Sequence, residues 1–140
     1  MSRVLVVGLL AAALGLPVRS FSQGSPADAA AALRGAATFK THCAPCHGTS
    51  ARGDGPMADA LRFAPADLTT IARRNAGKFP SDKVAKIIDG REAVKGHGGT
   101  DMPIWGDAFK SQVGYDERRV KAVIGELVQH LARLQAPAEK

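Results

Sequence analysis

The chain has few aromatic residues and few cysteines. Aromatic side chains make up 5% of its 140 residues, and there are two cysteines. A single domain of this length has a small core, and a shortage of large rings fits either a core that is completed by a ligand or an ordinary alanine-rich helical protein. With 45% hydrophobic and 23% charged residues, the composition excludes a disordered or collagen-like chain.

The sequence also lacks the regular alternation of apolar and polar residues that marks a half-buried strand, and it contains no internal repeat. Helical spacing is present instead. Residues 116–134 carry apolar side chains at three- and four-residue intervals, which predicts an amphipathic helix. Further helices are expected from a cap at Ser25 or Asp28 to about Lys40, and over residues 81–90. The predicted fold class is all-α.

Some positions within this helical pattern need a separate explanation. Gly35 costs the first predicted helix about 1 kcal/mol relative to alanine. It lies one turn before Phe39 on the same side, so we expect another helix to approach closely there. Residues 69–74 are predicted to form a short helix. The glycine-broken stretch 94–109 is predicted to contain no regular structure.

No apolar run is long enough to cross a membrane comfortably. Residues 4–18 form a run of 15 residues, whereas about 20 are needed. A basic start at Arg3 and small residues at 20–22 flank the run, which is typical of a secretory signal peptide over residues 1–22; an uncleaved anchor is the alternative. We therefore expect a flexible N-terminus at 23–27, one domain at 28–136, and a periplasmic or otherwise exported protein.

Charge of one sign does not dominate the chain. Loss of Arg3 and Arg19 with the signal peptide lowers the formal net charge from +6 to +4, which is too mild in an exported protein to indicate nucleic-acid binding. Residues 73–110 carry eight Lys or Arg against five acids. This excess fits either a surface that binds an acidic partner or a solvated helix face. Membrane contact is expected only if the N-terminal segment stays attached.

Both cysteines lie in one motif, CAPCH, formed by Cys43, Cys46 and His47 around two other residues. Cysteines at i and i+3 on a helical turn place both sulfurs on one side, matching the two vinyl groups of a porphyrin. The spacing predicts one covalently attached haem c, with His47 as the proximal iron ligand. His42 precedes the motif too closely to reach the opposite haem face. A zinc site would need a second ligand pair and a thioredoxin-like site a βαβ unit, and the sequence has neither.

The second axial position has two main candidates, Met102 and His97. Met102 lies in the segment TDMPIWG, where Pro103 biases it towards extended backbone, and a thioether suits iron(II). We expect Met102 to be the distal ligand and His97 to be a loop residue. Met57 and His130 are predicted to be packing residues.

These motifs resemble the class I bacterial monohaem cytochromes c over about residues 28–134. The matches are Gly35 and Phe39 ahead of CAPCH, then GDGP, PADLT, DMPIWG and the closing amphipathic helix. The resemblance implies helices packed around one haem, with the first and last helices crossing at Gly35 and Phe39. It also implies His47 as the proximal ligand and Met102 as the distal one.

The resemblance implies roles for two further residues. Pro56 resembles the family's proline whose carbonyl accepts a hydrogen bond from the proximal imidazole. Trp105 resembles the family's aromatic residue whose indole N–H donates to a haem propionate. The chain departs from the family at His130, where a tyrosine or tryptophan is common. A contact between His130 and Phe39 is expected, and it would make the helix crossing sensitive to pH.

With both axial positions filled, the iron has no open position for a substrate. The sequence therefore predicts an electron carrier that works by outer-sphere transfer with redox partner proteins, and not an enzyme. One alternative is a haem c subunit, or a membrane-anchored module, of a larger oxidoreductase complex. Another is a haem enzyme or gas-binding protein in which Met102 is a labile ligand.

Overall fold

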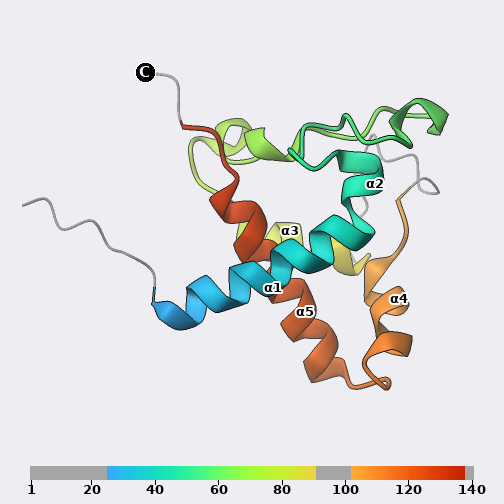
Figure 1. Ribbon diagram of the computed structural model, residues 1–140. Coiled ribbons are helices and arrows are strands. Elements are labelled where there is room, and N and C mark those ends of the chain that lie inside the picture. The colour runs from blue at the N-terminus through green and yellow to red at the C-terminus, as the bar shows by residue number, and fades with distance from the viewer. Residues whose placement is uncertain (1–24, 91–101, 138–140) are drawn as a thin grey trace, which may run out of the picture.

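The computed structural model describes residues 25–90 and 102–137. Within these residues every regular element is a helix, which confirms the all-α prediction (Figure 1). The elements are α1 (Pro26–His42), α2 (Ala44–His47), three short 3₁₀ turns η1 (Ala58–Ala60), η2 (Leu68–Thr70) and η3 (Arg73–Asn75), then α3 (Ser81–Asp89), α4 (Trp105–Gln112) and α5 (Glu117–Arg133). The predicted signal peptide and His97 lie outside the described residues.

The start of α1 uses both predicted capping residues. The Ser25 hydroxyl accepts a hydrogen bond from the backbone N–H of Asp28 at 3.2 Å, and the Asp28 carboxylate accepts one from the N–H of Ser25 at 3.1 Å. This reciprocal arrangement satisfies two N–H groups that a helix start leaves unpaired. Residues 25–27 therefore belong to the cap and first turn of α1, and not to the flexible segment predicted at 23–27.

Helices α1 and α5 cross at the predicted face. A Cβ atom on Gly35 would lie 1.9 Å from the carbonyl oxygen of Glu126, so the two backbones are in direct contact. The rings of Phe39 and His130 are 5.3 Å apart between centroids, which confirms the predicted contact. Next to the crossing, Arg34 Nε lies 2.5 Å from Glu126 Oε1. The glycine thus lets two helices approach closely at the centre of the fold.

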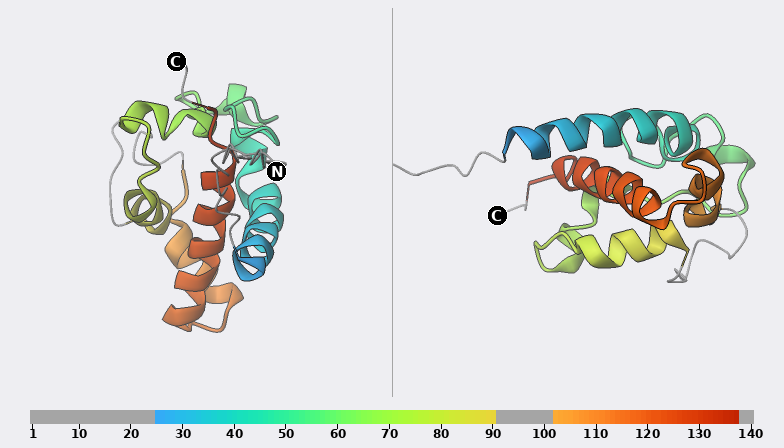
Figure 2. Two further views of the ribbon diagram at one scale, coloured as in Figure 1. Left: turned by 90° about the vertical axis from the view of Figure 1, so that its left-hand side faces the viewer. Right: turned by 90° about the horizontal axis from the view of Figure 1, so that it is seen from below.

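Helix α5 forms the middle layer of the molecule. Figure 2 shows it between α1 on one side and α3 on the other. It begins as predicted, with the Asp116 carboxylate accepting a hydrogen bond from the N–H of Arg118 at 2.9 Å. Its apolar stripe is buried: Val120, Ile124, Leu127, Val128 and Leu131. This stripe holds the other helices together through apolar burial.

Helices α3 and α4 differ in part from the prediction. Helix α3 ends at Gly90, which has a φ of +86°. Its N-cap is Pro80, which makes no side-chain hydrogen bond. Helix α4 begins at Trp105, inside the stretch predicted to be irregular. The local helix propensity of this stretch is low, but burial of Phe109, which is 1% exposed, stabilises the short helix.

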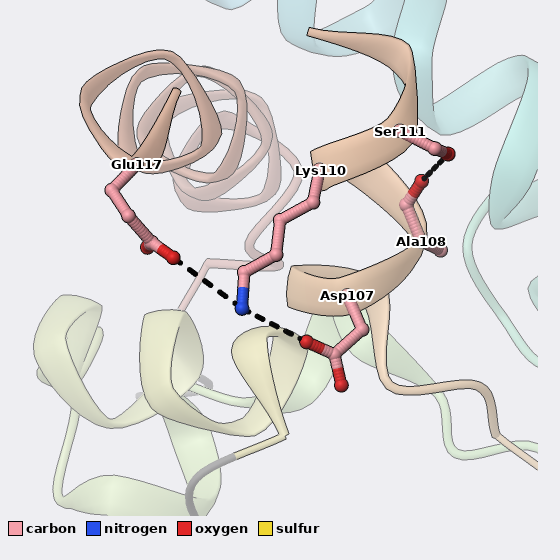
Figure 3. A network of polar contacts seen from close by, with 5 residues as sticks. All are labelled: Asp107, Ala108, Lys110, Ser111 and Glu117. Atoms are coloured by element: carbon pink, nitrogen blue, oxygen red, sulfur yellow. Dashed lines mark hydrogen bonds and ion pairs between the residues drawn. The ribbon is translucent and has the colours of Figure 1, made fainter. Parts of the chain in front are cut away.

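A polar network on the surface joins α4 to α5. Lys110 lies between two carboxylates, at 3.0 Å from Asp107 and 3.3 Å from Glu117, and the Ser111 hydroxyl donates to the carbonyl of Ala108 (Figure 3). Hydrogen bonds to Asp107 and then Glu117 raise the pKa of Lys110. Because the network is exposed, it orients the α4–α5 turn more than it stabilises the fold.

The loop that follows α2 is fastened to the end of α5 by one side chain. The Gln135 amide nitrogen donates to the carbonyls of Leu68 and Leu131, and its oxygen accepts from the N–H of Ala72. This segment contains two 3₁₀ turns in place of the helix predicted at 69–74. Gln135 thereby holds the loop against the helices that surround the site.

Candidate functional site

The CAPCH motif lies on a single helical turn. Cys43 is the C-cap of α1 and the N-cap of α2, and the N–H of His47 donates to the carbonyl of Cys43 at 2.8 Å. Both cysteines are free thiols and half-buried, while His47 is buried. Burial, with a smaller effect of Cys46, raises the pKa of the Cys43 thiol to about 12. The turn therefore presents two thiols and one imidazole together.

Two adjoining cavities open against this turn. The smaller one has a volume of about 40 Å³. Its lining includes Cys43, Cys46, His47 and Met102. Met102 follows His47 by 55 residues, so the fold brings together the side chains that the sequence predicted as attachment and ligand residues.

The larger cavity, of about 250 Å³, shares Cys43, His47, Met102 and Trp105 with the smaller one. The rest of its lining is mostly apolar: Phe39, Ala66, Leu68, Ile71, Pro80, Val84, Ile87, Ile88, Leu127 and Leu131, together with Arg74, Asn75 and Lys83. The cavity lies among α1, α3, α5 and the loop that Gln135 fastens. It suits a large apolar group that contacts both His47 and Met102.

The His47 ring is oriented by a backbone carbonyl. Its Nδ1 lies 3.1 Å from the carbonyl oxygen of Ala66. A carbonyl only accepts, so Nδ1 carries the proton and Nε2 carries the lone pair that a metal requires. A hydrogen bond of this kind also raises the basicity of the imidazole as a ligand.

The carbonyl partner predicted for His47 was Pro56, and the structure corrects this. The segment around Pro56 contacts the backbone of α2 instead: the N–H groups of Gly53, Gly55 and Met57 donate to the carbonyls of His47, Cys46 and Pro45. These bonds hold Pro56 beside the carbonyl end of α2, so the chain reaches the imidazole only ten residues later. Pro65, the second proline of this loop, directly precedes Ala66. The sequence therefore did contain a proline next to the residue whose carbonyl contacts His47.

Comparison with known protein families gives one match. Residues 30–117, more than half of the chain, match the family described as cytochrome C oxidase, cbb3-type, subunit III. The chain belongs to this family. It is therefore a c-type cytochrome domain, with covalently bound haem c and a role in electron transfer. No curated protein and no solved structure matches the chain significantly.

The residues of this cytochrome domain fit haem c chemically. Two thiols suit the vinyl groups, the imidazole and thioether suit iron, and the apolar lining suits the porphyrin. Within the described residues, no group of three or more His, Cys, Asp or Glu side chains is placed to hold a metal ion.

Sequence reasoning missed the cationic rim of the larger cavity. The exposed side chains of Arg74 and Lys83 belong to its lining. Arg74 is held in place because its guanidinium donates to the Thr70 hydroxyl at 2.5 Å and to the carbonyl of Asp67 at 3.0 Å. The Asp67 carboxylate has a lowered pKa, mainly through its hydrogen bond from the Thr69 hydroxyl. A cationic rim favours the carboxylate end of an otherwise apolar group.

The remaining candidate residues have mixed outcomes. Met57 is 51% exposed, so the prediction that it packs inside is wrong. His130 is half-buried against Phe39, as predicted. His42, which the sequence left without a role, packs edge-on against Trp105 and Phe109 and lines the smaller cavity. It joins the end of α1 to α4.

Proposed function

We propose that the chain is an exported monohaem cytochrome c of class I type that carries electrons between redox proteins by outer-sphere transfer. The observation that supports this most is the lining of the smaller cavity, where both cysteines, His47 and Met102 lie together. The N-terminal segment at 1–22 would direct export and be removed, which accounts for a periplasmic location. The cationic rim and the mild positive charge favour acidic partners.

Each residue has a defined task in this proposal. Cys43 and Cys46 would hold haem c through thioether bonds, and His47 Nε2 and the Met102 sulfur would ligate its iron. When bound, haem c supplies the one-electron iron couple. Trp105, whose ring is stacked on Phe109 with 5.5 Å between the centroids, would donate its indole N–H to a propionate. With His47 and Met102 both used as ligands, the chain would transfer electrons without binding a substrate at the iron.

The test is a redox titration with absorption spectra of the exported, haem-loaded protein and its Met102→Ala variant. The wild type should show the weak long-wavelength absorption of sulfur ligation in the ferric state. The variant should lose this absorption, and its potential should fall by on the order of 100 mV, a fraction of the roughly 0.8 V that axial ligands span. Met57→Ala removes an exposed methionine outside both cavities and is the matched control. A Met102→Ala protein that keeps the wild-type potential would refute the ligand assignment.

The family match supports a second candidate function, a haem c subunit of a larger oxidoreductase complex. In that case residues 4–18 would remain as an anchor. In the described part of the chain, no helix has the length and apolar character needed to cross a membrane. N-terminal sequencing of the cellular protein separates the two. A free carrier should start near residue 23 and fractionate with soluble proteins, whereas an anchored subunit should keep its N-terminus and sediment with membranes.

A further inference from the structure

We propose that the end of α3 and the start of α4 form a clasp that positions Met102 and so determines how firmly this sulfur competes for the iron. The clasp consists of Asp89 and Gly90 on one side and Ile104 and Gly106 on the other. This inference rests on the proposed function, because it takes Met102 as the distal ligand.

The first contact of the clasp joins Asp89 to Gly106. A Cβ atom on Gly106 would lie 2.1 Å from Asp89 Oδ1 and 2.7 Å from the Asp89 carbonyl oxygen. The backbone of the first turn of α4 therefore lies directly on Asp89, and no larger residue fits without movement. Ile104, the N-cap of α4, makes no side-chain capping bond. A carboxylate beside this turn is favoured by the helix dipole.

The second contact joins Gly90 to Ile104. A Cβ atom on Gly90 would lie 2.4 Å from Ile104 Cγ2. Gly90 also turns the chain at the end of α3 with its φ of +86°, a conformation in which side chains are strained. The two contacts together hold residues 89–90 against residues 104–106.

Met102 lies at the edge of this clasp. It precedes Ile104 by two residues, and the intervening Pro103 has a φ restricted by its ring. Little backbone freedom therefore separates Met102 from the clasp. Because this segment is short and restricted, a shift at Gly106 is transmitted to the methionine sulfur. Such a shift matters, since a ligand must be held to within about 0.5 Å to act well. Asp89 and Gly106 act through Met102 and are positioning residues.

The experiment measures imidazole binding to the ferric, haem-loaded protein. Imidazole competes with the methionine, so its affinity reports how firmly Met102 is held. In Gly106→Ala the added Cβ should push α4 away from Asp89. Imidazole should then bind roughly tenfold more tightly than to wild type, a change of about 1.4 kcal/mol. The sulfur absorption should weaken in parallel.

Two controls separate positioning from general destabilisation. Gly125→Ala makes the same change in α5, where a Cβ meets nothing within 4 Å, and should leave imidazole affinity unchanged. Val128→Ala opens a gap in the core away from both cavities, and should lower the free energy of unfolding with imidazole affinity within twofold of wild type. If Val128→Ala strengthens imidazole binding as much as Gly106→Ala does, the effect is global and the clasp is refuted.

A milder variant keeps the inference testable if Gly106→Ala does not fold. Ile104→Ala removes the side chain that contacts Gly90 from a 55% exposed position, and should strengthen imidazole binding about threefold. Wild-type affinity in Ile104→Ala and in any folded Gly106→Ala refutes the clasp and leaves the proposed function intact. If wild type lacks the sulfur absorption and binds imidazole as tightly as Met102→Ala, the ligand assignment fails instead.

Discussion

At the scale of single residues, the site depends on which partner each polar side chain contacts. The Ala66 carbonyl selects the tautomer of His47, and Thr70 and Asp67 hold Arg74 at the rim of the larger cavity. His130 differs from these, because its environment at the α1–α5 crossing is largely apolar. Burial lowers the pKa of His130 below its ordinary value of 6.5.

The position of His130 predicts a pH-dependent stability. The folded state binds the His130 proton less readily than the unfolded state does. The neutral ring therefore contributes fully to the free energy of unfolding above about pH 6.5. This contribution is lost as the pH falls through the lower pKa of the folded state. On the two crossing helices, Glu126 lies one turn before His130 and is paired with Arg34, while Arg133 and Lys40 lie in the last turns of α5 and α1.

His130→Phe should therefore be more stable than wild type, by about 0.5–1 kcal/mol at pH 8, because a phenyl ring packs well against Phe39. The difference should grow as the pH is lowered to 5, since the variant has no ring to protonate. Urea unfolding of the haem-loaded proteins at a series of pH values measures this. Parallel stability curves for the two proteins would rule out His130 as the pH-sensitive group.

At the scale of elements, the fold is built on the crossing of α1 and α5. Gly35 allows this crossing, since the backbone of Glu126 and Leu127 occupies the space of its missing side chain. The same crossing places the C-terminal end of α1, and with it the CAPCH turn, beside the apolar stripe of α5. A change at Gly35 therefore reaches the site through the angle between two helices.

Gly35→Ala should lower the free energy of unfolding by about 3 kcal/mol or more, because the methyl group overlaps backbone and not a movable side chain. Gly125→Ala, with open space around it, should raise the stability by up to about 1 kcal/mol through helix propensity. Denaturant unfolding of the two variants beside wild type gives both values. Equal effects of the two substitutions would contradict the close approach at Gly35.

At the scale of the whole molecule, the larger cavity lies where a small domain would otherwise have its core. The cavity has a volume of about 250 Å³ and a mostly apolar lining, so a group that fills it removes apolar surface from water and stabilises the fold. The fold and the cofactor are thus coupled energetically.

Removal of covalent attachment tests this coupling. The double variant Cys43→Ser, Cys46→Ser should be produced without retained haem, and should lose most of its cooperative thermal transition when followed by circular dichroism. The single variant Cys46→Ser keeps one thioether and should lie between the double variant and wild type. A haem-free protein with a wild-type melting temperature would show that the polypeptide fills its own core.

The sequence by itself determined the features that depend on nearest neighbours along the chain. The spacing of Cys43, Cys46 and His47, the apolar period of α5 and the reciprocal cap at Ser25 are local, because a helical turn places residues three and four apart on one face. Helix class, the haem attachment motif and His47 as a candidate ligand follow from such spacing. The resemblance to cytochromes c added the α1–α5 crossing.

Only the tertiary structure decided the contacts between distant segments. The carbonyl that meets His47 belongs to Ala66 because the preceding loop first folds back along α2, which no local pattern specifies. Helix α4 forms inside a glycine-rich stretch because Phe109 is buried against the core. The clasp at Asp89 and Gly106 arises from close approach of two helix ends. In each case the stabilising free energy comes from packing against residues that are remote in sequence, so residue spacing alone does not predict these contacts.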